Sequence, residues 1–178
     1  TGRPGFRFAG VRRAARALKM RETPLRMVIF DYLQLGESEG HNNNERIGKL
    51  SGALKDVAKR YDVPVIAVSQ LNRNVEARED KRPMLQDLRD SGQIEQDADV
   101  VLFCYRDEYY LERSQPDADA DNGEKLMRWN TLLEASRGKM EIICAKQRMG
   151  PLGTVTVDAD LATNRITDEA HGRAGDFR

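Results

Sequence analysis

The sequence predicts an α/β fold in which a mainly parallel sheet carries helices on both faces. Short runs of continuously apolar residues recur along the chain at 27–30, 63–68, 100–105 and 142–145. Between the first two runs, residues 46–61 place apolar side chains at helical spacing. Apolar strands that alternate with amphipathic helices are typical of a sheet buried on both faces. In such sheets, ligands bind at the carboxyl ends of the strands.

The first half of the chain contains the clearest helix. Residues 46–61 carry Ile47, Leu50 and Leu54 on one face, and the asparagines that end the polar loop 36–44 can cap the N-terminus of this helix. The other elements predicted in this half are a loop at 1–10, a short amphipathic helix at 11–21, strands at 27–30 and 63–68, and a charged loop at 72–84.

The second half is predicted to contain three strands and fewer helical residues. The predicted elements are a helical turn on either side of Ser91 and Gly92 within 85–97, a strand at 100–105, an acidic surface loop at 107–123, a helix at 126–135, a strand at 141–145, a turn at 150–153 and a strand that starts at 154–157. Part of this half, 125–138, is expected to be a surface excursion. The polar tail from about residue 159 is expected to be flexible.

Composition indicates a soluble globular domain. The 178 residues are 33% charged and 39% hydrophobic, which suits one domain with a core. Lys plus Arg and Asp plus Glu are 29 each, so the total charge gives no support for a nucleic-acid partner. No apolar run reaches membrane-spanning length, and no signal peptide is expected. Cys104 and Cys144 lie in apolar runs and are expected to be buried thiols, and no zinc spacing is present.

Polar residues follow three of the apolar runs. Asp31 ends the first, Ser69 and Gln70 end the second, and Lys146 and Arg148 end the last. A lone buried carboxylate is costly unless it is paired, hydrogen-bonded or near a metal. Asp31 therefore either caps backbone donors at the sheet edge or holds a ligand there. The convergence of polar residues at strand ends favours a ligand site.

Four blocks of the sequence occur in an order that points to one family. They are VIFDYLQL (28–35), VPVIAVSQLNR (63–73), KRPMLQDLRDSGQIEQDADVVLFCYRDEYY (81–110) and IICAKQRMGPLGTV (142–155). They resemble the C-terminal ATPase domain of replicative DNA helicases of the DnaB family. The resemblance covers most of the chain, and so many ordered blocks are more specific than any single short motif.

The resemblance implies a RecA-like P-loop NTPase core that works as a ring-shaped homo-hexamer. It implies ATP and Mg²⁺ as cofactors, and unwinding of duplex DNA by translocation on single-stranded DNA. It also implies primase and a helicase loader as partners in the primosome, and a cytoplasmic location at replication forks. The whole chain, 1–178, would be the C-terminal part of one such ATPase domain.

The resemblance also assigns roles to individual residues. Asp31 resembles the Walker B aspartate that holds Mg²⁺, an ion that prefers oxygen ligands and keeps several waters. Gln70 resembles the glutamine that senses the terminal phosphate. Taken singly, these two residues are better explained as a capping aspartate and an ordinary turn glutamine, and only the flanking blocks favour the family's roles for them.

Two further groups have roles by the same resemblance. The stretch from Asp87 to Gly92, which includes Arg89 and Asp90, resembles the loop that grips the DNA backbone, although the family commonly has Glu where Asp90 stands. Lys146 and Arg148 alternate along a strand and resemble the cations that reach into the nucleotide of a neighbouring subunit, with Arg148 as the arginine finger. A solvated charged loop and two edge-strand cations are the ordinary alternatives.

Two parts of the family's catalytic machinery are missing from this sequence. No G-x-x-x-x-G-K-[ST] phosphate loop and no upstream catalytic glutamate are present. We therefore expect the chain to be the second half of the ATPase domain, inactive alone. Without the phosphate-loop strand, the strand at 27–30 is expected to have an open apolar edge.

Three other classes of protein compete with the helicase interpretation. A receiver domain would use Asp31, Ser69 and Lys146, but it needs an early acidic pair that the sequence lacks. A catalytically inactive, helicase-derived module for DNA binding or ring assembly is the main alternative. A recombinase-like relative on the same fold is less favoured, because the SQLNR and DLRDSG stretches resemble the helicases more closely.

Overall fold

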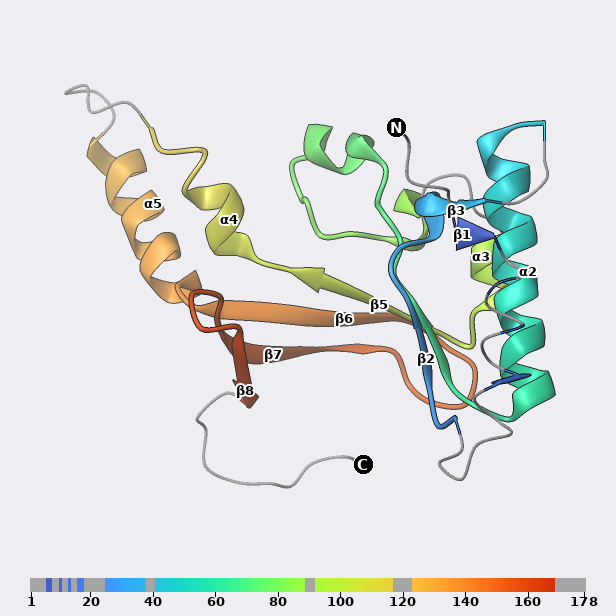
Figure 1. Ribbon diagram of the computed structural model, residues 1–178. Helices are drawn as coiled ribbons and strands as arrows, with labels where there is room; N and C mark the ends of the chain where they lie inside the picture. The colour runs from blue at the N-terminus through green and yellow to red at the C-terminus, as the bar shows by residue number, and fades with distance from the viewer. Residues whose placement is uncertain are drawn as a thin grey trace, which may run out of the picture. The chain divides into compact units, whose positions relative to one another are not determined.

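The chain is described by a computed structural model that covers 6–7, 10, 13, 16–17, 25–37, 41–88, 92–116 and 123–168 (Figure 1). The chain divides into two compact units, Thr1–Val101 and Leu102–Arg178.

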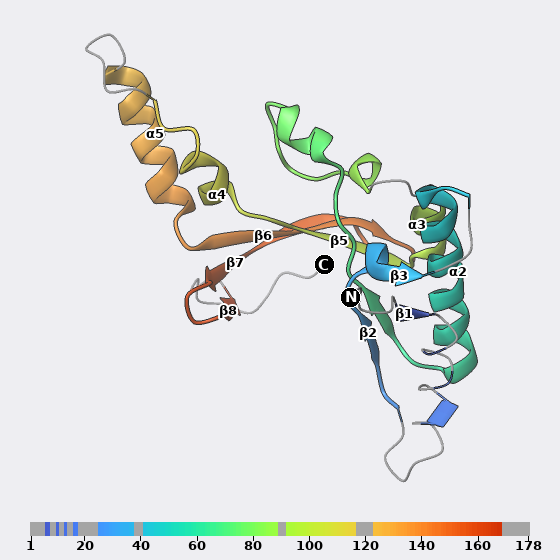
Figure 2. The same ribbon diagram turned by 45° about the horizontal axis from the view of Figure 1, so that its top comes forward.

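The first unit contains a parallel pair of strands joined by a long helix. Strand β2 (Val28–Phe30) pairs with β4 (Val65–Ala67), and Phe30 lies opposite Ala67. The connection between them contains helix α2 (Asn43–Tyr61), as the geometry of parallel strands requires. Figure 2 shows α2 alongside the short strands β1 and β3 of this unit. The strands predicted at 27–30 and 63–68 and the helix at 46–61 are thus confirmed.

Helix α2 begins and ends where the sequence supplies caps. The Asn42 side chain accepts a hydrogen bond from the Glu45 N–H at 2.8 Å, and the Glu45 carboxylate accepts one from the His41 N–H at 2.9 Å. These reciprocal bonds satisfy donors that a helix start leaves open. Asp62 ends the helix in the left-handed conformation. The buried side of the helix consists of Ile47, Leu50, Ser51, Leu54 and Val57.

Short elements complete the first unit. Strand β1 (Phe6–Arg7) pairs in parallel with β3 (Gly36–Glu37), where the sequence predicted loops, because two-residue strands leave no periodic signal. The remaining elements are the 3₁₀ turns η1 (Leu33–Leu35), η2 (Arg73–Ala77) and η3 (Leu85–Asp87) and the helix α3 (Gly92–Asp97). Most of the helix predicted at 11–21 lies outside the described residues.

The second unit is built on a sheet of strand order β5-β6-β7-β8. These strands are β5 (Val100–Tyr105), which crosses the boundary between the units, β6 (Lys139–Gln147), β7 (Gly153–Asp160) and β8 (Arg165–Asp168). Strand β7 runs antiparallel to both β6 and β8. A small core of Met140, Val157 and Ala159, with Ile142 against it, forms between β6 and β7.

Two helices lie between β5 and β6 in the sequence. They are α4 (Asp107–Leu111) and α5 (Gly123–Ser136), which contact each other (Figure 2). The Trp129 Nε1–H donates a hydrogen bond to the Leu111 carbonyl oxygen at 2.9 Å. The helix predicted at 126–135 is confirmed, and α5 contributes no buried side chain.

The α/β fold is confirmed, but three expectations differ from the structure. The sheet is parallel only in the first unit, and the short connection from β6 to β7 requires antiparallel strands. The acidic segment at 107–123 begins with α4 instead of a loop. Residues 159–168 form the end of β7, a turn and β8, so the expected flexible tail does not begin there.

Several sheet residues expose apolar side chains. Ile29 in β2 is 65% exposed and Ile66 in β4 is 48% exposed. Among the described residues, no strand other than β4 pairs with β2, in agreement with the predicted open edge. Cys104 is exposed, which corrects the expectation of two buried thiols, and Cys144 is half-buried. No described helix is long and apolar enough to cross a membrane.

Candidate functional site

The first unit brings the ends of β2 and β4 side by side. The Val68 N–H donates to the Phe30 carbonyl at 2.9 Å, and the Leu33 N–H donates to the Val68 carbonyl at 2.9 Å. Asp31 follows β2 and Gln70 follows β4, so both predicted residues lie at the same edge of the parallel pair. This edge is where ligands bind in α/β sheets.

The Asp31 carboxylate has the properties of a ligand-binding group. Its side chain is exposed, and no hydrogen bond or ion pair links it to another of the described residues. Carboxylate oxygen is a ligand type that Mg²⁺ prefers, and a single carboxylate suffices where phosphates and water supply the rest. Among the described residues, no group of three or more His, Cys, Asp or Glu is placed to hold a metal. The donor present thus fits a magnesium ion shared with a bound phosphate.

Gln34 joins the two strand ends through both atoms of its amide. Its Nε2 donates to Ser69 Oγ at 3.2 Å, and its Oε1 accepts from the Gln70 N–H at 3.2 Å. Gln34 lies in η1, the turn that follows Asp31, and it is half-buried. Gln34 belongs to the VIFDYLQL block, but its role could not be predicted, since nothing in the local sequence pattern indicates its distant partners.

The chain beyond Gln70 runs beside the segment that leads into 89–91. Leu71 and Leu88 form an isolated antiparallel bridge. The Asn72 N–H donates to the Asp87 carbonyl oxygen at 2.7 Å. The loop between them, which includes η2 and η3, is therefore closed at its base, and the start of the predicted DNA loop is fixed against the strand end at Gln70.

Arg78 and Asp87 form a bidentate ion pair inside this loop. Arg78 Nη1 lies 3.0 Å from Asp87 Oδ1, and Arg78 Nη2 lies 2.7 Å from Asp87 Oδ2. The Met84 N–H also donates to Asp87 Oδ2, at 2.8 Å. Asp87 is 4% exposed. The resemblance grouped Asp87 with the DNA-gripping loop, but its carboxylate points inward and holds the base of that loop.

Only part of the predicted DNA loop is described. Arg89 and Asp90 lie outside the described residues. Gly92 is exposed at the first position of α3, and a Cβ placed on it would meet nothing within 4 Å. Packing against the described residues therefore does not explain a glycine at this position. The close approach of a DNA backbone, the reason expected from the sequence, stays a prediction.

Lys146 and Arg148 lie at the end of β6 in the second unit. Lys146 is a half-buried residue of β6, whereas Arg148 is exposed and comes one residue after the strand ends at Gln147. Side chains alternate between the two faces only within a strand, so the expectation that Lys146 and Arg148 point the same way does not follow for Arg148. Exposure of Arg148 suits a cation that acts on a group outside its own chain.

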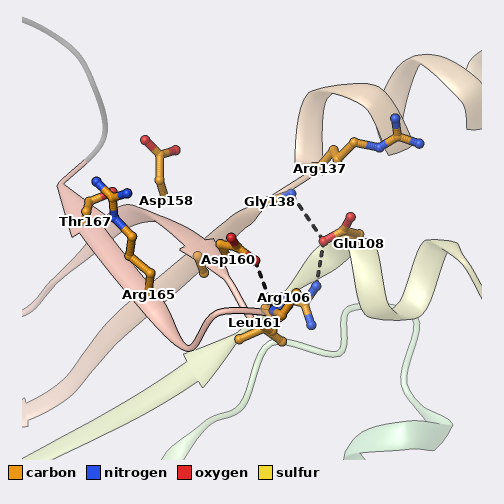
Figure 3. Close-up of a pocket in the computed structure, with 11 residues that line it drawn as sticks. Arg106, Glu108, Arg137, Gly138, Asp158, Asp160, Leu161, Arg165 and Thr167 are labelled. Carbon is orange, nitrogen blue, oxygen red and sulfur yellow. Dashed lines mark hydrogen bonds and ion pairs between the residues drawn. The ribbon is translucent and has the colours of Figure 1, made fainter.

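The second unit also has a polar hollow that the sequence did not predict (Figure 3). Glu108 Oε2 accepts hydrogen bonds from Arg106 Nη2 at 2.6 Å and from the Gly138 N–H at 3.2 Å. Hydrogen bonds from Thr163 hold the pKa of Asp160 below its usual value. Both carboxylates are satisfied by their own chain, which favours a structural network. Neither Lys146 nor Arg148 lines this hollow.

Comparison with known proteins identifies relatives of this chain. The model of the DnaB-like helicase C-terminal domain family matches residues 2–168. The chain is 46% identical over 168 residues to the replicative DNA helicase DnaB of Rickettsia bellii, covering 93% of this chain and 34% of the relative. It is 44% identical over 157 residues to the replicative DNA helicase DnaC of Bacillus subtilis, covering 86% of this chain and 30% of the relative.

Solved structures show the same similarity. A DnaB-like replicative helicase, described with its interactions with primase, matches 95% of this chain and 36% of its own chain, with a TM-score of 0.75 and 36% identity. The ATPase domain of G40P matches 93% of this chain and 52% of its own, with a TM-score of 0.76 and 38% identity. The fold is therefore that of RecA-like ATPase domains, and this chain spans about a third of the length of the curated relatives it matches.

Proposed function

The chain belongs to the DnaB-like helicase C-terminal domain family, and on this premise we propose that it is the second part of an ATP-dependent replicative DNA helicase motor. Both of its units are parts of one RecA-like ATPase domain, 1–178. The complete protein forms a ring hexamer in the cytoplasm at replication forks, binds single-stranded DNA, and works with primase and a helicase loader.

The observation that carries this proposal is the arrangement at the ends of β2 and β4. An exposed Asp31 carboxylate, without a partner among the described residues, lies at the same sheet edge as Gln70. When Mg²⁺ is bound, it neutralises charge on the phosphates of ATP. Asp31 would hold this ion, and the Gln70 side chain, exposed at the strand end, would donate a hydrogen bond toward the terminal phosphate.

The cations of the second unit contribute to electrostatic stabilisation of the transition state of ATP hydrolysis. Arg148 reaches the nucleotide of a neighbouring subunit as the arginine finger, and Lys146 accompanies it. Their role is to stabilise negative charge that develops on the transferred phosphoryl group. Exposure of Arg148 beyond the end of β6 supports action across a subunit boundary. Arg89, Asp90 and Gly92 contact the DNA backbone in the central channel.

Replacement of the metal-binding carboxylate tests the proposal. In the full-length gene product, Asp31→Asn should lower DNA-stimulated ATP hydrolysis by at least about 100-fold, as expected for loss of a charged group that stabilises the transition state. Asp56→Asn, at an exposed position of α2, is the matched control and should retain activity. Unchanged hydrolysis in Asp31→Asn would contradict the assignment of Asp31.

A mixing experiment tests the proposed arginine finger. Arg148→Ala and Asp31→Asn subunits should each form inactive rings. Mixed rings should regain hydrolysis, because some interfaces then combine an intact Asp31 with an intact Arg148 from the neighbour. Mixed rings without any recovery would argue that both residues serve the same subunit.

The alternative function is a catalytically inactive module for DNA binding or ring assembly. The absence of a phosphate-loop motif from these 178 residues is the observation that favours it. We propose that this segment by itself hydrolyses no ATP and that the longer protein does. Nucleotide binding by the full-length gene product separates the two functions, since the inactive module would bind DNA without binding ATP.

A further inference from the structure

A continuous series of hydrogen bonds and backbone pairings joins the turn after Asp31 to the base of the predicted DNA loop. We propose that Gln34 and Arg78 are positioning residues that couple the nucleotide end of β2 and β4 to the segment that grips DNA. Neither residue is assigned to touch ATP or DNA. This inference rests on the proposed function, because it needs both ligands to bind.

The first link in this series is the amide of Gln34. This one amide bonds both Ser69 and Gln70. One side of the amide donates and the other accepts, so its orientation is fixed by two different partners. A shift of the turn that carries Asp31 therefore moves the backbone of Gln70 with it. The Ser69 hydroxyl, which also contacts the Gln70 carbonyl oxygen at 3.3 Å, extends this link.

The second link transfers the position of Gln70 to the entrance of the DNA loop. Leu71, directly after Gln70, bridges to Leu88, directly before the 89–91 segment. The hydrogen bond from the Asn72 N–H to the Asp87 carbonyl, at 2.7 Å, is part of this bridge. This backbone pairing restricts movement of one segment relative to the other.

The third link is the guanidinium of Arg78. Besides its two bonds to Asp87, Arg78 Nη2 donates to the Arg82 carbonyl at 2.8 Å, and Nε donates to the Asp80 carbonyl at 3.3 Å. One planar group therefore bonds three residues of the loop: Asp80, Arg82 and the buried Asp87. Such a fork of donors cannot be reproduced by lysine, whose ammonium acts as a single point charge.

Coupling of this kind has a measurable thermodynamic consequence. If ATP and DNA bind to sites that share one mechanical frame, each ligand must change the affinity of the other by the same factor. That factor typically lies between about 5-fold and 150-fold. A residue with a merely structural role would change stability or both affinities together, whereas a coupling residue changes the factor itself.

The experiment measures this factor in the full-length gene product. Dissociation constants are determined for a fluorescent oligo-dT with and without a non-hydrolysable ATP analogue, and for a fluorescent ATP analogue with and without oligo-dT. The test variants are Gln34→Met, which keeps the side-chain length but removes both amide bonds, and Arg78→Lys, which keeps the charge but removes the fork. Matched controls are Gln115→Met and Arg128→Lys, at exposed positions of the second unit.

The inference predicts that both test variants bring the coupling factor below about twofold, from a wild-type value in the range given above. Affinity for the nucleotide without DNA should remain at the wild-type value, and both controls should retain the wild-type factor. A wild-type factor in Gln34→Met would overturn the inference. If Gln34→Met does not assemble, Ser69→Ala is the test variant, because it removes only one of the two bonds of the Gln34 amide. An unchanged coupling factor in Ser69→Ala would also overturn the inference.

The outcomes separate this inference from the proposed function. Failure of the wild-type protein to bind ATP or DNA would refute the proposed function. Binding of both ligands by the wild-type protein without any mutual effect would leave the helicase function standing and would overturn the coupling role of Gln34 and Arg78.

Discussion

Gly36 should tolerate no larger residue unless Leu50 is made smaller. Its backbone angles, φ −70° and ψ 133°, are ordinary for any residue, so conformation does not require glycine. Space does, because a Cβ on Gly36 would overlap Leu50 Cδ2 and would lie 3.2 Å from the Leu33 carbonyl and 3.3 Å from the ring of Phe30. Leu50 is 1% exposed, so its side chain cannot turn out into solvent to make room.

The magnitudes follow from packing. Gly36→Ala should lower the free energy of unfolding by about 1–3 kcal/mol, the usual cost of overpacking. Leu50→Ala alone should lower it by about 3–5 kcal/mol, through lost burial and a cavity. In the double variant the clash disappears and the new methyl group occupies part of the cavity, which adds about 0.8 kcal/mol of recovered burial. The double variant should therefore be more stable than the sum of the single effects by about 2–4 kcal/mol.

Urea denaturation of the 178-residue chain, followed by far-ultraviolet circular dichroism, measures this interaction energy. A double-mutant cycle gives it directly from the four free energies of unfolding. Additivity of the two single effects within about 0.5 kcal/mol would refute the packing argument, because it would mean that Gly36 and Leu50 do not share space.

Three further predictions concern the local bonds of the helices. Asn42→Ala should lower the free energy of unfolding by about 1 kcal/mol through loss of the α2 cap, while Asn42→Asp retains it, as urea denaturation would show. The pKa of Glu45 lies below its ordinary value of 4.5 because of the hydrogen bond with Lys49 and that from the His41 N–H. The stability contributed by these bonds of Glu45 is therefore present above the unfolded pKa and is lost as pH falls through the lower folded pKa. An NMR titration should place the Glu45 midpoint below 4.5. A midpoint at or above 4.5 would contradict these bonds. Trp129→Phe should remove about 1 kcal/mol from the docking of α5 on α4, seen as faster hydrogen exchange in α5, and unchanged exchange would contradict that role.

The strand ends could be predicted from the sequence, because uninterrupted apolar runs followed by polar residues have one simple explanation. Asp31 directly follows β2, and Gln70 comes three residues after β4 ends at Ala67, at the same edge of the pair. The direction of β7 relative to β6 could also be predicted from the sequence. Only a few residues separate β6 from β7, and a parallel pair needs a much longer crossover.

The role of Asp87 could not be predicted, because a charged segment looks the same whether its carboxylate faces water or a partner. Its partner Arg78 lies nine residues earlier, outside any periodic pattern. The contacts of Gln34 are more distant still, 35 and 36 residues along the chain. Such pairings depend on the tertiary structure, and no local propensity records them.

Helix α5 offers a practical opportunity to the experimenter. Since none of its side chains is buried, and Met127 is 73% exposed, this helix can carry a dye or an affinity tag at little cost to the core. A single cysteine at position 127, in a background without the two natural cysteines, would give a handle for immobilising the protein or for following it on individual DNA molecules.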